Sequence, residues 1–326
     1  MEVKKITLIF LTMFVPMWCV LVPFGTFLFI CFLPFRLFPM GLVKKTIPQQ
    51  NLQVTIIGGD DDDKKKRDKR TKGKEDIVFI HGWPDSKQLW SRIVPNFSSN
   101  HRCICVTLPN YAGKGPNEGW GVDFDEIADD LVRTIEKEKK SSQVTIICHD
   151  WGCFHAFNVY GRRPNLIKRI AALDVAPQPE KSISFLLFSV TYQFFLIYCW
   201  LLGSAGTCIQ RIAMYNAKYR ARPISELYST MNYSYYYIWK AILFGSRKER
   251  RKKLNPPLKC YDLATCPIYF AYGRKKICMF HSKKWIDLLK KNSNCMVSSF
   301  DCDHWIPTKK AMEVSDEISA WMRSSE

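Results

Sequence analysis

The sequence lacks the patterns that mark several classes of protein. Its 13 cysteines include no CxxC pair and no grouping with histidine at metal-ligand spacing, so neither a metal site nor a cofactor is predicted. No internal repeat is present, which argues against a solenoid. The scattered cysteines, with Cys103 and Cys105 alternating on a predicted strand, are typical of reduced thiols in the cytosol. Two glycosylation triplets, at Asn96 and Asn232, leave a luminal location open.

Aromatic side chains are missing from the most basic segments. The formal net charge is +18, and much of it lies in "KKKRDKRTKGK" (64–74) and "RKERRKK" (247–253). Such an excess suits an anionic surface, either nucleic acid or acidic lipid. Proteins that bind nucleic acid interleave aromatic and basic residues or carry a known module, and neither feature occurs here. We therefore predict two solvated loops and no nucleic-acid partner.

Charge is absent from residues 6–35. A bilayer core takes about 20 apolar residues, whereas the apolar part of a signal peptide has only about 7–15. Residues 1–40 are therefore predicted to form a retained membrane anchor. Three prolines within it leave a kinked span and a monotopic hairpin open. The predicted location is a membrane, that of the endoplasmic reticulum, with the folded domain facing the cytosol.

Short apolar runs alternate with helical patterns after residue 50. This alternation predicts an α/β fold with a mostly parallel sheet and helices on both faces. Residues 179–261 differ in character and are rich in aromatics, so they are predicted to form an inserted cap on a core made of 50–178 and 262–326. The predicted strands are 52–57, 76–82, 102–109, 143–150, 167–177, 266–273 and 295–301, and the clearest helices are 123–139, 151–163 and 311–323.

The stretch "VTIICHDWGC" (144–153) ends an apolar strand on a carboxylate. Cys148 and Gly152 place small residues two positions before and after Asp150. A strand that turns sharply into a helix needs this spacing, because larger neighbours would clash in the turn. The pattern is that of a nucleophile elbow. It resembles the α/β-hydrolase superfamily, in the branch of epoxide hydrolases and haloalkane dehalogenases, whose nucleophile is aspartate. The resemblance covers roughly residues 76–324.

A second motif, "HGWP" (81–84), strengthens this resemblance. In the family, the residue after His-Gly and the residue after the nucleophile each lend a backbone N–H to the oxyanion hole. The resemblance therefore implies an oxyanion hole made by Trp83 and Trp151. His304, in "FDCDHWIP", lies between the last strand and the last helix, where the family carries its catalytic histidine.

The sequence departs from the family at the third member of the triad. The usual acid follows "YG" near the end of the penultimate strand, but here the text is "YGRKKICMFH", and Lys276 stands in its place. A cation cannot stabilise an imidazolium. Some dehalogenases take the acid from the strand after the elbow helix, which implies Asp174. Asp301 and Asp303 are alternatives near His304.

The resemblance implies attack on saturated carbon, an ester on Asp150, and hydrolysis of that ester by water that His304 activates. Cap tyrosines donate a proton to the opened epoxide in the family. Tyr233 and Tyr237 share a helical face in "MNYSYYYIWKAIL" and are the candidates here. The predicted substrate is a small lipophilic epoxide. A haloalkane-type dehalogenase and a non-catalytic membrane protein that binds a lipid or partner remain alternatives.

A second charge-free segment, residues 182–210, opens the predicted cap. It is long enough to span a bilayer. Two arrangements are open: the segment packs on the domain as the first part of the cap, or it dips into the bilayer and lets a lipophilic substrate enter from the membrane.

Overall fold

The structure is a computed structural model. It describes residues 52–58, 75–113, 120–177, 179–180, 182–216, 222–253, 266–276 and 278–325. These residues lie within one compact unit, Asn51–Glu326. The predicted anchor, residues 1–40, and the first basic run, residues 64–74, lie outside the described residues.

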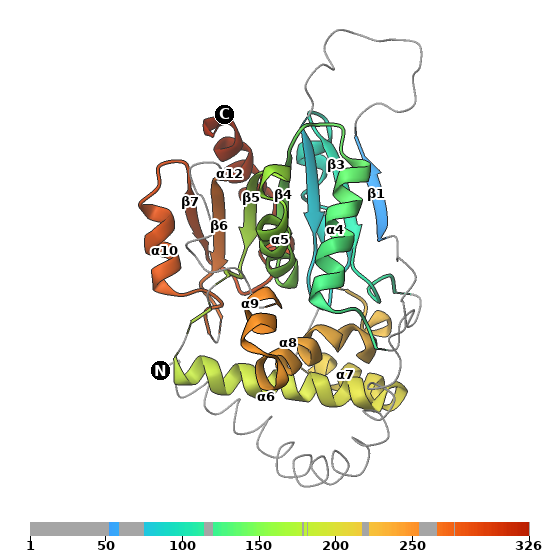
Figure 1. Cartoon of the computed structure of the whole chain (residues 1–326). Coiled ribbons are helices and arrows are strands. Elements are labelled where there is room, and N and C mark those ends of the chain that lie inside the picture. The colour runs from blue at the N-terminus through green and yellow to red at the C-terminus, as the bar shows by residue number, and fades with distance from the viewer. Residues whose placement is uncertain are drawn as a thin grey trace. The chain divides into compact units, whose positions relative to one another are not determined.

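A seven-stranded sheet runs through the unit in the order β1-β3-β2-β4-β5-β6-β7 (Figure 1). The edge strand β1 pairs antiparallel with β3, and the other five pairings are parallel. The predicted mostly parallel sheet is thereby confirmed. The strands are β1 (Gln53–Ile57), β2 (Asp76–Ile80), β3 (Arg102–Thr107), β4 (Val144–His149), β5 (Ile167–Leu173), β6 (Ile268–Gly273) and β7 (Met296–Phe300).

The central strands are apolar along their whole length because both faces of the sheet are covered. Every residue of β2 is buried. Ile77 and Phe79 belong to one hydrophobic cluster, and Val78 and Ile80 belong to another. Successive side chains of a strand point to opposite faces, so the two clusters are the cores on the two sides of the sheet.

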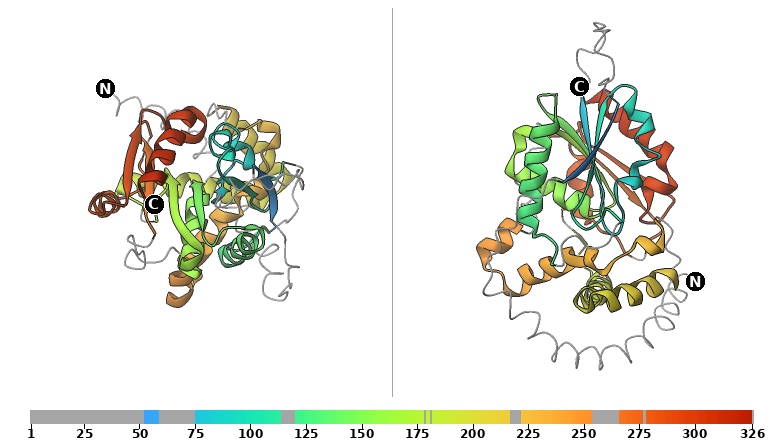
Figure 2. Two further views of the ribbon diagram at one scale, coloured as in Figure 1. Left: turned by 90° about the horizontal axis from the view of Figure 1, so that it is seen from above. Right: turned by 90° about the vertical axis from the view of Figure 1, so that its right-hand side faces the viewer.

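Helices cover both faces of the sheet, as predicted (Figure 2). One core contains side chains of α4 (Phe124–Glu138), α5 (Trp151–Arg162) and α10 (Lys283–Lys290). The other contains side chains of α3 (Pro95–Ser98), α11 (Ile306–Lys309) and α12 (Ala311–Ser324). Short 3₁₀ turns lie at Lys87–Trp90 and Pro164–Leu166.

The connection between β5 and β6 contains a helical insertion. Its elements form a layer beside one end of the sheet (Figure 1). They are α6 (Ile183–Leu202), α7 (Ser204–Asn216), the 3₁₀ turns Ile224–Glu226 and Ser229–Asn232, α8 (Tyr233–Phe244) and α9 (Arg247–Lys253). Within α6, Phe185–Leu202 is, in the described part of the chain, the one stretch long and apolar enough to cross a membrane by length and composition, a property that buried core helices share.

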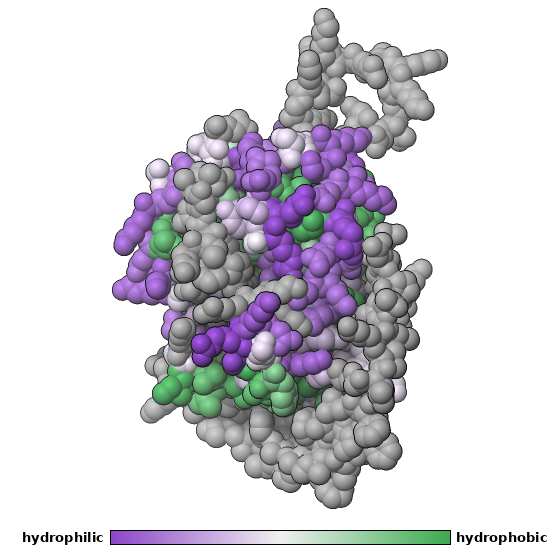
Figure 3. Space-filling model, viewed as in Figure 1, coloured by the Kyte–Doolittle hydropathy of each residue, from purple (hydrophilic) through white to green (hydrophobic). Residues whose placement is uncertain are grey.

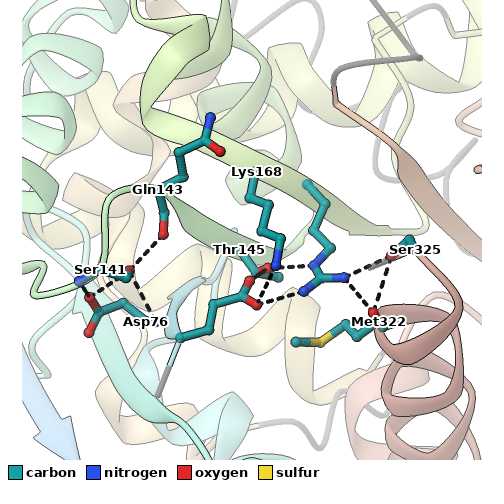
Figure 4. Close-up of polar contacts among 9 residues, drawn as sticks. Asp76, Ser141, Gln143, Thr145, Lys168, Met322 and Ser325 are labelled. Carbon is teal, nitrogen blue, oxygen red and sulfur yellow. Dashed lines mark hydrogen bonds and ion pairs between the residues drawn. The ribbon is translucent and has the colours of Figure 1, made fainter. Parts of the chain in front are cut away.

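A cluster of ion pairs joins the amino-terminal ends of β2, β4 and β5 (Figure 4). Glu75 lies 2.6 Å from the Arg169 guanidinium and 3.2 Å from Lys168 Nζ. Arg169 Nε donates to Thr145 at 3.0 Å, and its Nη1 donates to both the carbonyl of Met322 and the Ser325 hydroxyl. Buried charges in proteins are usually paired, as they are here, and removing one partner of such a pair is strongly destabilising. The cluster ties the last helix to the sheet, and its charges satisfy one another.

Candidate active site

Asp150 occupies a sharp turn between β4 and α5. Its backbone angles are φ 54° and ψ −126°, a region that non-glycine residues rarely adopt and that active sites often contain. Gly152 is required there, because a Cβ at this position would lie 2.1 Å from the carbonyl oxygen of Ile80. Cys148 is fully buried. The structure therefore has the turn that the small-residue spacing predicts.

Two backbone amides hold the Asp150 carboxylate. The Trp83 N–H donates to Asp150 Oδ1 at 2.7 Å, and the Trp151 N–H also hydrogen-bonds to this carboxylate and lowers its pKa. Gly82 allows the close approach, since a Cβ there would lie 2.4 Å from Asp150 Oδ1. His81 holds the loop by accepting a hydrogen bond from the Leu108 N–H at 3.0 Å. The amides of the two predicted oxyanion residues thus meet at one carboxylate.

His304 lies between two carboxylates from different strands. Its Nε2 is 3.3 Å from Asp150 Oδ2, and its Nδ1 is 2.5 Å from Asp174 Oδ2. Asp174 follows β5 and is fully buried, with φ 76°. The side chains of Asp150 and His304 are each 18% exposed, so solvent reaches one end of this line and not the other. The structure brings together the three residues of the predicted triad.

Lys276 points at the same acid. Its Nζ lies 2.7 Å from Asp174 Oδ1, and its side chain is only 4% exposed. The Gly273 N–H donates to the same oxygen at 2.9 Å. The cation at the usual acid position therefore pairs with the acid from the neighbouring strand. The two alternative acids have other partners: Asp301 pairs with Lys275 and Asp303 with Lys309.

Attraction between opposite charges shifts the pKa values of this group of side chains. Burial alone would lower the pKa of His304, but hydrogen bonds and charge from Asp150 and Asp174 outweigh it and raise the pKa to about 10. Burial alone would raise the pKa of Asp174, but His304 and Lys276 lower it to about 2. The pKa of Asp150 is also lowered, again against the effect of burial and chiefly by His304. At neutral pH the site holds an imidazolium between two carboxylates.

The predicted proton donors contact other parts of the structure. The ring of Tyr233 packs on Tyr111 and over Gly121, where a Cβ would lie 2.1 Å from the ring. Tyr237 packs against Tyr236 and lies near Lys240. These placements do not support the predicted pair.

Tyr235 packs on both tryptophans of the site, and Tyr192 packs on Tyr235. Burial first, and the charge of Asp150 in addition, raise the pKa of both phenols. The Tyr235 ring lies edge-on to Trp83, Trp151 and Tyr192, with centroid distances of 5.8, 5.3 and 5.8 Å. The rotation of α8 about its own axis decides which of its tyrosines packs on Trp83 and Trp151. Tertiary contacts of the helix set that rotation. The charge-free segment that contains Tyr192 gives no sign of a site residue.

The insertion is bonded to the loop that carries Trp83. The Trp83 indole N–H donates to Asn232 Oδ1 at 2.8 Å, and Asn232 in turn donates to Gln210 and to the Leu196 carbonyl. Arg222 donates to the carbonyls of Pro84 and Asp85 at 3.0 and 3.2 Å. These contacts fix the loop against the insertion. The sequence predicts neither contact, because Asn232 belongs only to a glycosylation triplet and Arg222 belongs to no motif.

The described residues include no set of metal ligands. No group of three or more His, Cys, Asp or Glu side chains arranged to hold a metal ion occurs among the residues that the structure describes. The histidines near Asp150 have other surroundings: His149, for example, is fully buried, and its Nε2 contacts the His304 carbonyl at 2.9 Å.

Residues 77–196 match the family model described as the alpha/beta hydrolase fold. The chain is 31% identical over 103 residues to the soluble epoxide hydrolase of Corynebacterium sp., covering 31% of this chain and 35% of the relative. It is 25% identical over 114 residues to a haloalkane dehalogenase of Bradyrhizobium diazoefficiens, covering 34% and 36%. The alignments thus span about a third of the length of these curated relatives.

Solved structures extend the likeness to most of the chain. The crystal structure of an epoxide hydrolase from Bacillus megaterium in complex with an inhibitor superposes with a TM-score of 0.59 at 17% identity, covering 83% of this chain and 96% of that one. The chain therefore has the α/β-hydrolase fold. Its resemblance to epoxide hydrolases and haloalkane dehalogenases, expected from the motifs, is confirmed.

The charge of His304 predicts a pH dependence of stability. The pKa of His304 is raised on folding from 6.5 to about 10, so its contribution is full below about pH 6.5 and is lost as the pH rises through about 10. The difference in unfolding free energy between the native protein and His304→Gln, measured by urea denaturation, should shrink over this range. A difference that stays constant from pH 6.5 to 10 would contradict the assigned charge.

Proposed function

We propose that this protein is an epoxide hydrolase that acts through an ester on Asp150. The observation that carries the proposal is the line of contacts from Asp150 through His304 to Asp174, at 3.3 and 2.5 Å. A carboxylate is suited to attack saturated carbon, and a histidine beside it is suited to activate water for the second step. The similarity to epoxide hydrolases supports the same reaction class.

The contacts assign a task to each oxygen of Asp150. Oδ2 faces His304, whereas Oδ1 accepts the Trp83 N–H. Oδ2 attacks an epoxide carbon and the C–O bond of the ring breaks, leaving an alkoxide. Water then attacks the ester carbonyl carbon and gives its proton to His304 Nε2, and the charge that develops on Oδ1 lies beside the Trp83 N–H. Fixed donors at such an oxyanion are worth about 3 kcal/mol of barrier each. The bond between the carboxyl carbon and the substrate oxygen then breaks, that oxygen takes the proton from His304, and the diol leaves as the Asp150 carboxylate forms again.

Ester formation changes the charge around His304. The resting imidazolium is held by two carboxylates, and the ester removes the negative charge of Asp150. The proton on His304 then loses one of the two groups that hold it. The ring is partly exposed, so this proton passes to solvent. His304 thus becomes a base only after the first step, when the second step needs one.

Turnover of an aryl epoxide tests this proposal. Asp150→Ala should abolish diol formation, because no other group supplies the nucleophile. His304→Gln should stop the reaction at the ester, so that intact-mass analysis finds one substrate mass added to the protein. The double variant should show no adduct and serves as the control for non-specific alkylation. Unchanged turnover by Asp150→Ala would end the proposal.

We further propose that the helical insertion is a cap over this site and that Tyr235 and Tyr192 protonate the alkoxide. The effect of Asp150 on both phenols supports this placement. A dehalogenase would need free indole N–H groups for halide. Here the Trp83 indole is bound to Asn232, and the Trp151 side chain hydrogen-bonds to Tyr235, which favours an epoxide over a haloalkane.

Removing the hydroxyl group of Tyr235 tests its role as the proton donor. Tyr235→Phe should lower kcat for epoxide opening by about 100-fold, the usual scale for losing a general acid. Tyr236→Phe is the matched control, because Tyr236 follows Tyr235 in α8 and its ring stacks on Trp200 of α6. The kcat of this variant should change little. Equal effects of the two substitutions would argue against Tyr235 as the donor.

A membrane is the proposed partner, and a lipophilic molecule the proposed substrate. Exposed apolar side chains on one face of α6 support this: Ile183 is 77% exposed, Leu186 56% and Leu187 61%. Figure 3 shows hydrophobic surface where α6 and the end of α8 lie, beside strongly hydrophilic surface at α9. Apolar surface next to the exposed cations Arg247 and Lys248 suits a bilayer with anionic headgroups.

Substrate delivery from lipid tests this surface. Replacing Ile183, Leu186 and Leu187 together by Ser in the full chain on anionic vesicles should lower kcat/KM roughly tenfold for an epoxide dissolved in the bilayer. Turnover of a water-soluble epoxide should not change. Met312→Ser, at an exposed apolar residue of α12, is the control. Equal loss for both substrates would show that the insertion was merely damaged.

A further inference from the structure

Lys276 makes contacts that the proposed reaction has not used. Its buried ammonium group lies 2.7 Å from Asp174 Oδ1. It also lies 5.2 Å from the centre of the Phe280 ring, and that ring packs against His304 at 5.6 Å. Asp174 thus accepts from Lys276 on one oxygen and contacts His304 on the other. One carboxylate serves two cations.

This sharing weakens the hold of Asp174 on the proton of His304. A carboxylate near an imidazole favours the protonated ring, and a nearby cation opposes it. With Asp174 as a carboxylate partner and no cation beside that acid, His304 would hold its proton more tightly after Asp150 is esterified. A base that stays protonated cannot accept a proton from water.

We propose that Lys276 is a positioning residue whose charge competes with His304 for Asp174, so that His304 releases its proton to solvent at its exposed edge once Asp150 carries the ester. The inference rests on the proposed function for its role in turnover. Its electrostatic part stands on contacts alone. The cation at the position of the usual acid thus has a role in the second step of the proposed reaction.

The charged and titratable groups around this pair come from five places in the chain, one of which is Cys302 after β7, whose thiol interacts electrostatically with Asp174. Asp150 faces His304 from the elbow, Asp174 from the end of β5, and His149 from the end of β4, with its ring centre 4.5 Å from that of His304. Cys278 and His281, in the loop after β6, interact electrostatically with both Lys276 and Asp174. Lys276 and His304 are the two groups of this set that contact Asp174 as cations.

The test measures the imidazole of His304 directly, without turnover. Asp150→Asn removes the negative charge at residue 150, as ester formation does. The NMR titration of His304 in this variant therefore measures the pKa that the imidazole has when the second step begins. Adding Lys276→Met should raise the midpoint of that titration by roughly one pH unit, the scale of a lost neighbouring charge. The Gly273 N–H remains to bind Asp174 Oδ1.

Two matched variants separate charge from packing. Lys276→Arg keeps the charge and should restore the midpoint. Lys275→Met makes the same substitution one residue earlier, at a side chain that is 63% exposed and pairs with Asp301, and should leave the midpoint unchanged. If Lys276→Met does not fold, Lys276→Gln is measured in its place.

Each outcome decides the proposal. A midpoint that changes by less than about 0.3 unit, or that falls, would overturn it, because Lys276 would then not compete for Asp174. A raised midpoint in a protein that turns over no epoxide would support the electrostatic coupling and count against the proposed function instead. In an active protein, Lys276→Met should slow ester hydrolysis about tenfold at pH 7, with ester formation unchanged.

Discussion

The contact between the buried Asp174 carboxylate and His304 is the interaction on which the rest of the site depends. Asp174 orients the ring so that Nε2 faces Asp150, and it can do so because β5 lies beside β4 in the sheet. Parallel strands end at a common edge, so residues far apart in sequence meet there. The buried cluster around Arg169 holds the other ends of these strands, which keeps the two carboxylates in register.

Much of this arrangement follows from local sequence. The small residues around Asp150 predict the turn, because Gly152 lies against the Ile80 carbonyl. The apolar runs predict the strands, because both faces of the sheet are buried. The acid at Asp174 and its contact with His304 were also predictable, by way of the family resemblance. All of these features depend on short-range sterics or on strand order.

Other features depend on tertiary packing, which a single sequence does not reveal. The helix α8 was predictable, but a single sequence does not show that Tyr235, and not Tyr233, packs on Trp83 and Trp151. Lys276 stands at a position where a cation argues against a triad. Only the neighbouring strand shows that it pairs with the acid instead of replacing it.

The central claim is that Asp150 itself forms a bond to the substrate, and isotope transfer tests it most directly. With enzyme in excess over epoxide in H₂¹⁸O, the first turnover should give a diol without label and place ¹⁸O in the Asp150 carboxylate, because water attacks the ester carbonyl. Label in the diol after that single turnover would mean that water attacks the epoxide directly, and the account would be contradicted.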